Sequence, residues 1–579
     1  MRKSSGCAIA ALAEVLLYLS PTITPHKGNW RSFDVRRTLC CRQQFGVVAF
    51  ICMMLLRPAF VALAQTSASE YDHTHYVRGA ELARSGNFEL ALEEFQRAVK
   101  LTPNSPKVHN MLGVVLAQLG RLNESDDAYR RALSLAPDFF PARKNRAVNA
   151  FTRRDFAFAT DEFKALAKLE PRDFVPHLFL GLLAIEDSDF QVAQKHLLRA
   201  RECSPNNAQV LLALARVHFA LGERHSAMEF VRQMRDQSRS SDAEQFELGV
   251  LLAQFEANRE ATQVFQELWQ KGPGSYDLGF NLALVRYRAG QLEDGLQVVD
   301  DLLSRGHRTG ELLNLQGWMY NKMRRLAQAR ESLQKAITAE PYNPDHYLDL
   351  STVLANEGDV EAAIPIATEG LRKCVEKDRL QVQIGLLYQK RKDYTEAETW
   401  YQQGTQTSPG NRSAYLALAN LLLVTNRQKE ALELLAKATT VLPNDPLLHH
   451  MLGAQLLESE QEPSREQLEK AASILKKALD LNPFYANTHY VLGKLYLKTG
   501  DYELARSCFE KACGFKADHV GAYYQLSLIA RRQGNKERAA ELSRIVQRLN
   551  EKADKDYHED SISIVQESLR GARRELVRP

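Results

Sequence analysis

Fifteen histidines and eight cysteines are the residues of this chain whose types could bind a metal ion or act as a nucleophile. Five of the histidines recur at intervals of 34 residues or multiples of 34, apart from one interval of 40: His75, His109, His177, His449 and His489. Side chains spaced so far apart in tandem units do not converge on one ion, so we predict no metal site. Cys508 and Cys513 lie about 140° apart on a helix, which suits neither a disulfide bond nor a metal pair.

Motifs typical of catalytic and phosphate-binding sites are missing from the sequence. No glycine-rich phosphate loop follows a strand pattern, and neither the metalloprotease helix motif nor the paired-cysteine zinc spacing occurs. The chain holds 71 Asp and Glu residues, but the helical periodicity places them on solvated faces. We therefore predict no catalytic residues, no cofactor and a protein that is not an enzyme.

The charge is distributed unevenly along the 579 residues. Residues 1–64 hold eight Lys and Arg and two Asp and Glu, whereas the remainder holds 67 basic and 69 acidic residues. A nearly neutral body lacks the basic footprint of a nucleic-acid-binding protein. The composition, 45% hydrophobic and 25% charged, is that of an ordinary folded protein.

The N-terminal region carries the pattern of a targeting segment. Twelve uncharged residues, Phe45 to Leu56, follow Arg36, Arg37 and Arg42 and precede the small-residue run that ends at Ala64. This order is typical of a secretory signal peptide, and twelve residues are too few to span a bilayer. We predict an exported bacterial protein, periplasmic or envelope-associated, cleaved after Ala64 and translated from a downstream start.

Two alternatives to cleavage and export stay open. An uncleaved anchor over residues 45–64 would be the protein's only contact with a membrane. Alternatively, residues 1–64 are an N-terminal extension of a cytoplasmic protein.

From Asp72 the chain repeats with a period of 34 residues. A small residue recurs at the eighth position of each repeat, with one step of 40 and all others of 34: Gly79, Gly113, Ala147, Gly181, Ala215, Gly249, Ala283, Gly317, Ser351, Gly385, Ala419, Gly453, Gly493 and Ser527. A second small residue follows twelve positions later, and a proline follows twelve later again in nine of the fourteen repeats. Fourteen repeats fill residues 72–553.

Each repeat reads as two short helices joined in a hairpin. Small residues let two helix backbones approach closely, and proline ends the second helix because it has no amide to donate. A single hairpin cannot bury its apolar face alone, so neighbouring repeats must stack. The expected fold is an all-α solenoid with about 28 helices in residues 72–553 and no sheet.

This pattern resembles the tetratricopeptide repeat (TPR) family over residues 72–553. The period agrees, as do the small residue at position 8, alanine at position 20, a large apolar residue at position 24 and proline at position 32. The resemblance implies a right-handed superhelix whose concave face is lined by first helices, with the position-4 histidines in packing contacts. It also implies a non-enzymatic scaffold whose partners are other proteins or peptides.

Breaks in the pattern suggest subdivisions of the array. Arg239 and Val375 stand where proline is expected, and the fifth repeat ends in the polar run Gln237–Ser241. After the repeats, an apolar stripe with helical spacing predicts a capping helix: Ile562, Val565, Leu569, Ala572 and Leu576. The predicted regions are residues 1–64 as the targeting segment, 72–241 as repeats 1–5, 242–377 as repeats 6–9, 378–553 as repeats 10–14, and 554–579 as the capping helix and tail.

The first helices of repeats four to eight are apolar at positions that the resemblance assigns to the concave face. These residues are Leu178, Leu182, Leu212, Phe246, Val250, Phe280, Leu284 and Trp318, and we call them the apolar stripe. Exposed apolar patches on soluble proteins usually mark binding sites, so the stripe predicts a peptide-binding groove. The alternative is that tight coiling of the superhelix packs these side chains against each other.

Two functions fit these features. The first is an exported scaffold that binds polypeptides in its superhelix, within the cell envelope. The second is a cytoplasmic adaptor or regulatory subunit of a separate enzyme. The family's carboxylate clamp is rejected, because Lys144 and Asn145 lack the partners it requires in the following repeats.

Overall fold

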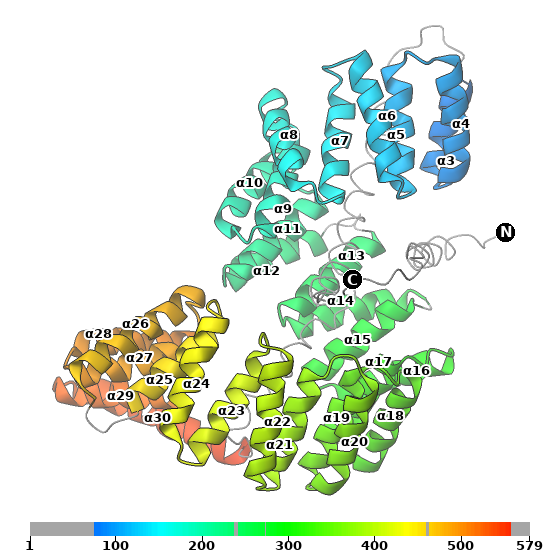
Figure 1. Ribbon diagram of the computed structural model, residues 1–579. Helices are drawn as coiled ribbons and strands as arrows, with labels where there is room; N and C mark the ends of the chain where they lie inside the picture. Colours follow the sequence, from blue (N-terminus) through cyan, green and yellow to red (C-terminus); the bar gives the residue numbers. More distant parts are fainter. Residues whose placement is uncertain (1–73, 237–240, 273, 459–462, 557–579) are drawn as a thin grey trace. The chain divides into compact units, whose positions relative to one another are not determined.

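The computed structural model describes residues 74–236, 241–272, 274–458 and 463–556, in which helices alternate with short turns (Figure 1). The 28 helices of the described residues form fourteen consecutive hairpins, and none of these residues lies in a strand. The predicted all-α solenoid is confirmed. Three predicted features lie outside the described residues. They are the targeting segment 1–64, residues 237–240 of the polar run, and the apolar residues of the tail from Ile562 to Leu576.

The described helices fall into two compact units that divide between Pro205 and Asn206. The first unit contains α3 (Thr74–Arg84), α4 (Phe88–Leu101), α5 (Pro106–Gln118), α6 (Leu122–Leu135), α7 (Phe140–Thr152), α8 (Phe156–Leu169), α9 (Phe174–Glu186) and α10 (Phe190–Cys203). Subdivisions after residues 241 and 377 stay predictions.

The second unit contains the remaining twenty helices. They are α11 (Ala208–Ala220), α12 (Arg224–Arg235), α13 (Asp242–Gln254), α14 (Asn258–Gln270), α15 (Tyr276–Ala289), α16 (Leu292–Ser304), α17 (Gly310–Lys322), α18 (Leu326–Ala339), α19 (Pro344–Asn356), α20 (Val360–Lys373), α21 (Asp378–Lys390), α22 (Tyr394–Thr407), α23 (Arg412–Val424), α24 (Gln428–Val441), α25 (Pro446–Glu458), α26 (Arg465–Leu481), α27 (Ala486–Thr499), α28 (Tyr502–Phe515), α29 (Val520–Arg532) and α30 (Lys536–Asp556).

In eight of the hairpins, a glycine at position 8 lies against a large side chain at position 24. A Cβ atom added to Gly113 would lie 2.5 Å from the ring of Tyr129, and one added to Gly493 would lie 2.6 Å from the ring of Phe509. Real Cβ atoms essentially never make contacts this short, so Tyr129 and Phe509 each require the glycine opposite them. Ser125 replaces alanine at position 20, and its hydroxyl donates to the Gly113 carbonyl at 2.7 Å.

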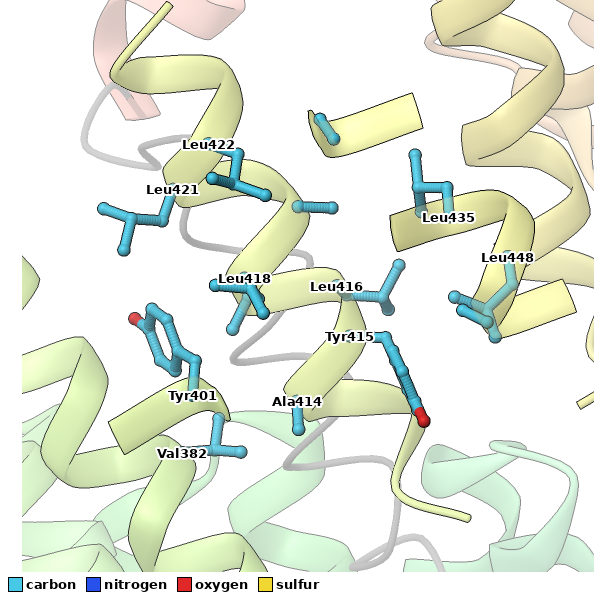
Figure 2. Packing of buried hydrophobic residues seen from close by; sticks show 14 of the residues in the cluster. Val382, Tyr401, Ala414, Tyr415, Leu416, Leu418, Leu421, Leu422, Leu435 and Leu448 are labelled. Carbon is cyan, nitrogen blue, oxygen red and sulfur yellow. The ribbon is translucent and has the colours of Figure 1, made fainter. Parts of the chain in front are cut away.

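Large side chains from several repeats meet between the hairpins. Figure 2 shows one such cluster, in which Tyr401 of α22 and Val382 of α21 lie beside Leu418 of α23. Leu435 of α24, in the same hairpin as Leu418, also belongs to the cluster. Leu448 of α25 joins it from the following hairpin. This part of the core therefore extends across neighbouring repeats rather than being confined to one hairpin.

Three of the position-4 histidines make a hydrogen bond that the sequence pattern did not predict. In each, Nε2 donates to the carbonyl oxygen of the proline six residues earlier, at 2.8–2.9 Å. The pairs are His109 with Pro103, His449 with Pro443 and His489 with Pro483. Tyr347 makes the same bond to Pro341 through its hydroxyl, at 2.9 Å. The residue that ends one repeat is thereby tied to the first helix of the next.

The six extra residues of the twelfth repeat fall at the turn of its hairpin and lengthen both the connection and the second helix. Helix α25 ends at Glu458 and α26 begins at Arg465. Ser464 and Gln467 form a capping box, in which the Gln467 amide donates to Ser464 Oγ at 3.2 Å. Since α26 has 17 residues, against 14 in most second helices, part of the insertion extends the helix.

The turn inside thirteen of the hairpins contains one residue with positive φ, always at position 15. Glycine occupies it in seven repeats, for example Gly86 at φ 82° and Gly500 at φ 85°. In the other six, a residue with a side chain adopts the left-handed conformation: Arg154, Ser188, Glu256, Arg324, Lys392 and Asn426. Such a residue pays a steric cost of about 1–2 kcal/mol that glycine does not.

We expect Lys392→Gly to raise the free energy of unfolding by about 0.5–1 kcal/mol. Lys392 has φ 68° and an exposed side chain, so relief of its backbone strain outweighs the greater freedom of glycine in the unfolded chain. Urea denaturation measures the change. Lys437→Gly is the matched control, because Lys437 is an exposed residue inside α24, where glycine should destabilise by about 1 kcal/mol. A loss of stability in both variants would contradict the expected strain.

Candidate binding groove

The structure places most of the apolar stripe in packing contacts. Five of its eight residues are at most 5% exposed: Leu178, Leu212, Val250, Phe280 and Leu284. The other three, Leu182, Phe246 and Trp318, are half-buried. The ring of Phe246 lies 5.6 Å from that of Phe265, and the ring of Phe280 lies 6.0 Å from that of Tyr276. Binding by the stripe stays a prediction, and only its half-buried members present an appreciable surface.

The second unit contains a groove of 1530 Å³ that several first helices line. Three residues of the stripe contribute to it: Phe280 and Leu284 of α15 and Trp318 of α17. Tyr287 and Leu315 extend this apolar lining. Most of the remaining lining is polar: Glu311, Asn314, Asn321, Lys322, Asn343, Asp345, His346, Asp349, Asn356 and Arg412 are among it. The groove therefore combines an aromatic patch with closely spaced amide and charged groups.

A hydrogen-bonded network connects α17 and α19 along the groove. Asn314 Nδ2 donates to Asp349 Oδ2 at 2.7 Å and to His346 Nδ1 at 3.2 Å. His346 Nε2 in turn donates to Glu340 Oε2 at 3.0 Å. The Gly310 amide donates to Glu340 Oε1 at 2.7 Å. Since the His346 side chain is only 2% exposed, these bonds hold its ring in one orientation.

The hydrogen bond from His346 is the main cause of the low pKa of Glu340. It lowers the pKa of the Glu340 carboxyl to about 2, helped by the Asn343 side chain and the Gly310 amide, while burial acts in the opposite direction. Gly310 is required here, because an added Cβ atom would lie 2.6 Å from Glu340 Cδ and would collide with His346 Nε2. The carboxylate therefore stays charged throughout the ordinary pH range.

Charged groups on neighbouring first helices are partly neutralised by each other. Asp345 of α19 forms an ion pair with Arg379 of α21 at 2.6 Å. Lys322 lies 4.5 Å from the centre of the Tyr287 ring, and its Nζ donates to the Tyr287 carbonyl at 3.4 Å. Burial lowers the pKa of Lys322. The groove thus presents both signs of charge around its aromatic patch.

Three residues of the predicted apolar stripe line the groove, whereas none of its polar residues was predicted from the sequence. The available signal was position 2 of the first helix, which is charged in four consecutive repeats: Asp277, Glu311, Asp345 and Arg379. Two of these residues, Glu311 and Asp345, line the groove. Charged residues on repeat surfaces are usually only solvated, so their charge alone did not indicate a groove.

Lys144 and Asn145 do not form a carboxylate clamp. Lys144 Nζ donates to Asp173 Oδ2 at 2.8 Å, and Asn145 Nδ2 donates to Asn110 Oδ1 at 3.0 Å. Lys144 is thus bonded to the last residue of its own repeat, and Asn145 is bonded to the preceding repeat.

Glu247 of α13, next to Phe246, is a half-buried carboxyl with a raised pKa. The pKa lies at about 7 instead of 4.5, mainly because of burial, while Arg216 of α11 lowers it and Glu244 raises it. A proton is therefore held more tightly in the folded state than in the unfolded chain. The protein should lose stability as the pH rises from 4.5 through about 7, where the folded state must bury a charge.

We expect Glu247→Gln to remove this pH dependence. The variant should be more stable than the parent protein at pH 8, by on the order of 1–3 kcal/mol, and nearly equal to it at pH 4.5. Urea denaturation at several pH values measures the difference. Glu433→Gln is the control, because Glu433 is an exposed residue of α24. A difference for Glu247→Gln that does not grow with pH would contradict the raised pKa.

The described part of the chain contains neither a candidate metal site nor a candidate membrane-spanning helix. No three or more His, Cys, Asp and Glu residues there lie close enough together to hold a metal ion. Among the same residues, no helix combines the length and the apolar character that crossing a membrane requires.

Family models match the chain in seven ranges, some of which overlap. Together they cover five separate stretches that exceed half of the chain's length. The model described as TPR repeat matches residues 79–120, and three models described as tetratricopeptide repeat match residues 106–139, then 178–243, 280–344 and 314–374, then 388–456 and 464–531. The chain belongs to the tetratricopeptide repeat family.

Curated relatives are similar over parts of the chain. The BBSome complex member BBS4 homolog of Drosophila melanogaster is 21% identical over 378 residues, which are 61% of this chain and 76% of that protein. Human tetratricopeptide repeat protein 13 is 32% identical over 114 residues, 18% of this chain and 13% of that protein. The peroxisomal targeting signal receptor of Candida glabrata is 43% identical over 63 residues, 11% of each protein.

Solved structures with similar folds cover most of the chain. Yeast Tom70 is 15% identical and covers 87% of this chain and 97% of its own, with a TM-score of 0.38. The APC/C hetero-tetramer Cut9-Hcn1 is 12% identical and covers 80% of this chain and 97% of its own, with a TM-score of 0.31.

Proposed function

We propose that this protein is a non-enzymatic scaffold that binds a segment of a partner polypeptide in the groove of the second unit. The groove itself carries the proposal: 1530 Å³ of space lined by an aromatic patch and by amide and charged side chains. An extended peptide offers both apolar side chains and main-chain hydrogen-bonding groups. Such a lining can satisfy both at once.

Two relatives support a role in protein recognition. One is named a targeting signal receptor and another a member of a complex. The complex member is similar over 76% of its length, but at low identity. From it we infer only that this protein works within an assembly.

Affinity purification of the full chain from its native cells, followed by mass spectrometry, would identify the partner. Trp318→Arg should then abolish partner capture, because Trp318 is a half-buried residue of the groove. Tyr394→Arg is the matched control: Tyr394 is a 38% exposed aromatic residue at the start of α22, outside the groove. Equal capture by both folded variants would contradict binding in this groove.

The proposed location is export to a bacterial periplasm or envelope. It rests on the apolar run Phe45–Leu56, the basic residues before it and the small-residue exit at Ala64. Osmotic-shock fractionation with N-terminal sequencing of the native protein tests it. A mature chain that begins after Ala64 in the exported fraction is expected. A cytoplasmic chain would instead favour the adaptor or regulatory subunit.

A further inference from the structure

The hydrogen-bonded network between α17 and α19 has a fixed direction. The Glu340 carboxylate, whose pKa lies at about 2, carries no proton at neutral pH, so its partners must donate to it. His346 therefore donates from Nε2, at 3.0 Å. Asn314 Nδ2 can only donate, and so His346 Nδ1, which lies 3.2 Å from it, accepts. The bonds thus run from Asn314 through His346 to Glu340.

This direction decides which atom of Asn314 is offered to an occupant of the groove. The side-chain nitrogen of asparagine has two hydrogens, and both are used: Nδ2 donates to His346 Nδ1 and to Asp349 Oδ2, the latter at 2.7 Å. The oxygen, Oδ1, makes no hydrogen bond within the described chain and is accessible to solvent. Since Asn314 lines the groove, it presents a hydrogen-bond acceptor there and no donor.

Two other groove residues of α17 lie on the same side of the helix as Asn314. Glu311 precedes it by three residues and Trp318 follows it by four, a spacing that places side chains on one helix face. We call Glu311, Asn314 and Trp318 the acceptor stripe. A carboxylate and an amide oxygen accept hydrogen bonds, and the face of an indole ring attracts a cation. All three groups therefore favour a positively charged donor.

Negative charge dominates the groove around the acceptor stripe. Helix α19 adds Asp345 and Asp349 to the lining, and Arg379 offsets only Asp345, at 2.6 Å. The basic lining residue of α17, Lys322, stands eight residues beyond Asn314, about 12 Å along the helix axis, and donates to a backbone carbonyl. A cation of a partner is therefore attracted to the acceptor stripe, whereas a carboxylate is repelled.

We propose that the acceptor stripe is the subsite for a lysine or arginine side chain of the partner segment. This inference rests on the proposed binding of a polypeptide in the groove, and it names the chemistry of the occupant. The ammonium or guanidinium group donates to Asn314 Oδ1 and to the Glu311 carboxylate, next to the Trp318 ring. A segment that is uncharged or acidic at this point binds more weakly.

Binding of three fluorescein-labelled peptides to the full-length protein tests the charge preference. The peptides are equally long and repeat Ser-Leu-Lys, Ser-Leu-acetyllysine or Ser-Leu-Glu, so that acetylation keeps the lysine stem and removes its charge. Fluorescence anisotropy should show about tenfold tighter binding of the lysine peptide than of the acetyllysine peptide. The glutamate peptide should bind most weakly. Equal affinities for the lysine and acetyllysine peptides would overturn the proposal.

Two variants assign the preference to the acceptor stripe. Asn314→Leu and Glu311→Gln should each remove most of the difference between the lysine and acetyllysine peptides. Glu311→Gln leaves every hydrogen bond of Asn314 in place, so it tests the subsite even if Asn314→Leu melts early. Glu433→Gln, which removes an exposed carboxylate of α24, is the matched control and should keep the full difference. A preference that survives Glu311→Gln in full contradicts the assignment.

This inference and the proposed function can fail separately. If Trp318→Arg abolishes partner capture while the protein does not distinguish lysine from acetyllysine, the groove binds a segment of other chemistry. If none of the three peptides binds, the cation subsite is rejected, and partner capture alone then decides whether the groove binds a polypeptide. Lysine-selective binding that Glu311→Gln abolishes supports both.

Discussion

Replacing Tyr401 by alanine is expected to lower the free energy of unfolding by about 3–5 kcal/mol. The Tyr401 side chain is fully buried in the cluster of Figure 2. Its ring fills the space opposite Gly385, where an added Cβ atom would lie 2.5 Å from Cδ1. Removal of the ring opens a cavity between helices that glycine cannot fill. Guanidinium or urea denaturation followed by circular dichroism measures the loss.

Tyr401→Phe separates the hydroxyl from the ring. The hydroxyl donates to Gln389 Oε1 at 2.7 Å inside the core, so its removal leaves a buried acceptor and should cost about 1–3 kcal/mol. Burial also raises the pKa of Tyr401, and the ring should not ionise in the folded state. A Tyr401→Ala variant as stable as the parent would contradict the alignment of positions 8 and 24.

Replacing Phe280 by serine is expected to destabilise the protein by about 3–5 kcal/mol, whereas Phe246→Ser should cost markedly less. Phe280 is 1% exposed and Phe246 is half-buried, although both belong to the apolar stripe. The two substitutions must be made separately, since in a double variant the loss of stability from Phe280 would mask any effect on binding. Thermal melting and partner capture are measured on the same preparations.

The single variants distinguish core from groove for each residue. Weakened capture by Phe246→Ser with little change in melting would assign Phe246 to the binding surface. Leu248→Ser is a useful reference for a core residue of α13, because Leu248 is fully buried. If Phe280→Ser melts like the parent protein, its burial in the described structure is contradicted.

Features within one repeat were predictable from the sequence, whereas the burial of concave positions was not. The pairing of Gly113 with Tyr129 recurs in the other hairpins that have glycine at position 8, because positions 8 and 24 meet there. Burial at position 5 depends on the neighbouring repeat as well, and so it varies from Leu178 at 0% to the half-buried Phe246. A periodic pattern averages over such neighbours and cannot separate these cases.

The polar network was unpredictable for a related reason. Glu340, Asn314 and His346 come from two successive repeats and from different positions in them. No single column of the alignment contains them. The bond from His489 to Pro483 recurs in two other pairs with the same spacing, but neither ring nitrogen of His177, six residues after Pro171, makes a hydrogen bond. The spacing alone therefore does not predict the bond.

The position of the histidine–proline bond indicates where this chain tolerates a change of length and where it does not. It closes a short ring across the junction between repeats, and one added residue there would displace His489 from Pro483. The natural insertion lies instead at the opposite end of a hairpin, between Glu458 and Arg465, and the next junction keeps its bond at 2.8 Å. The hairpin tips are therefore the places where a reporter domain or an epitope can be grafted without changing how neighbouring repeats pack on each other.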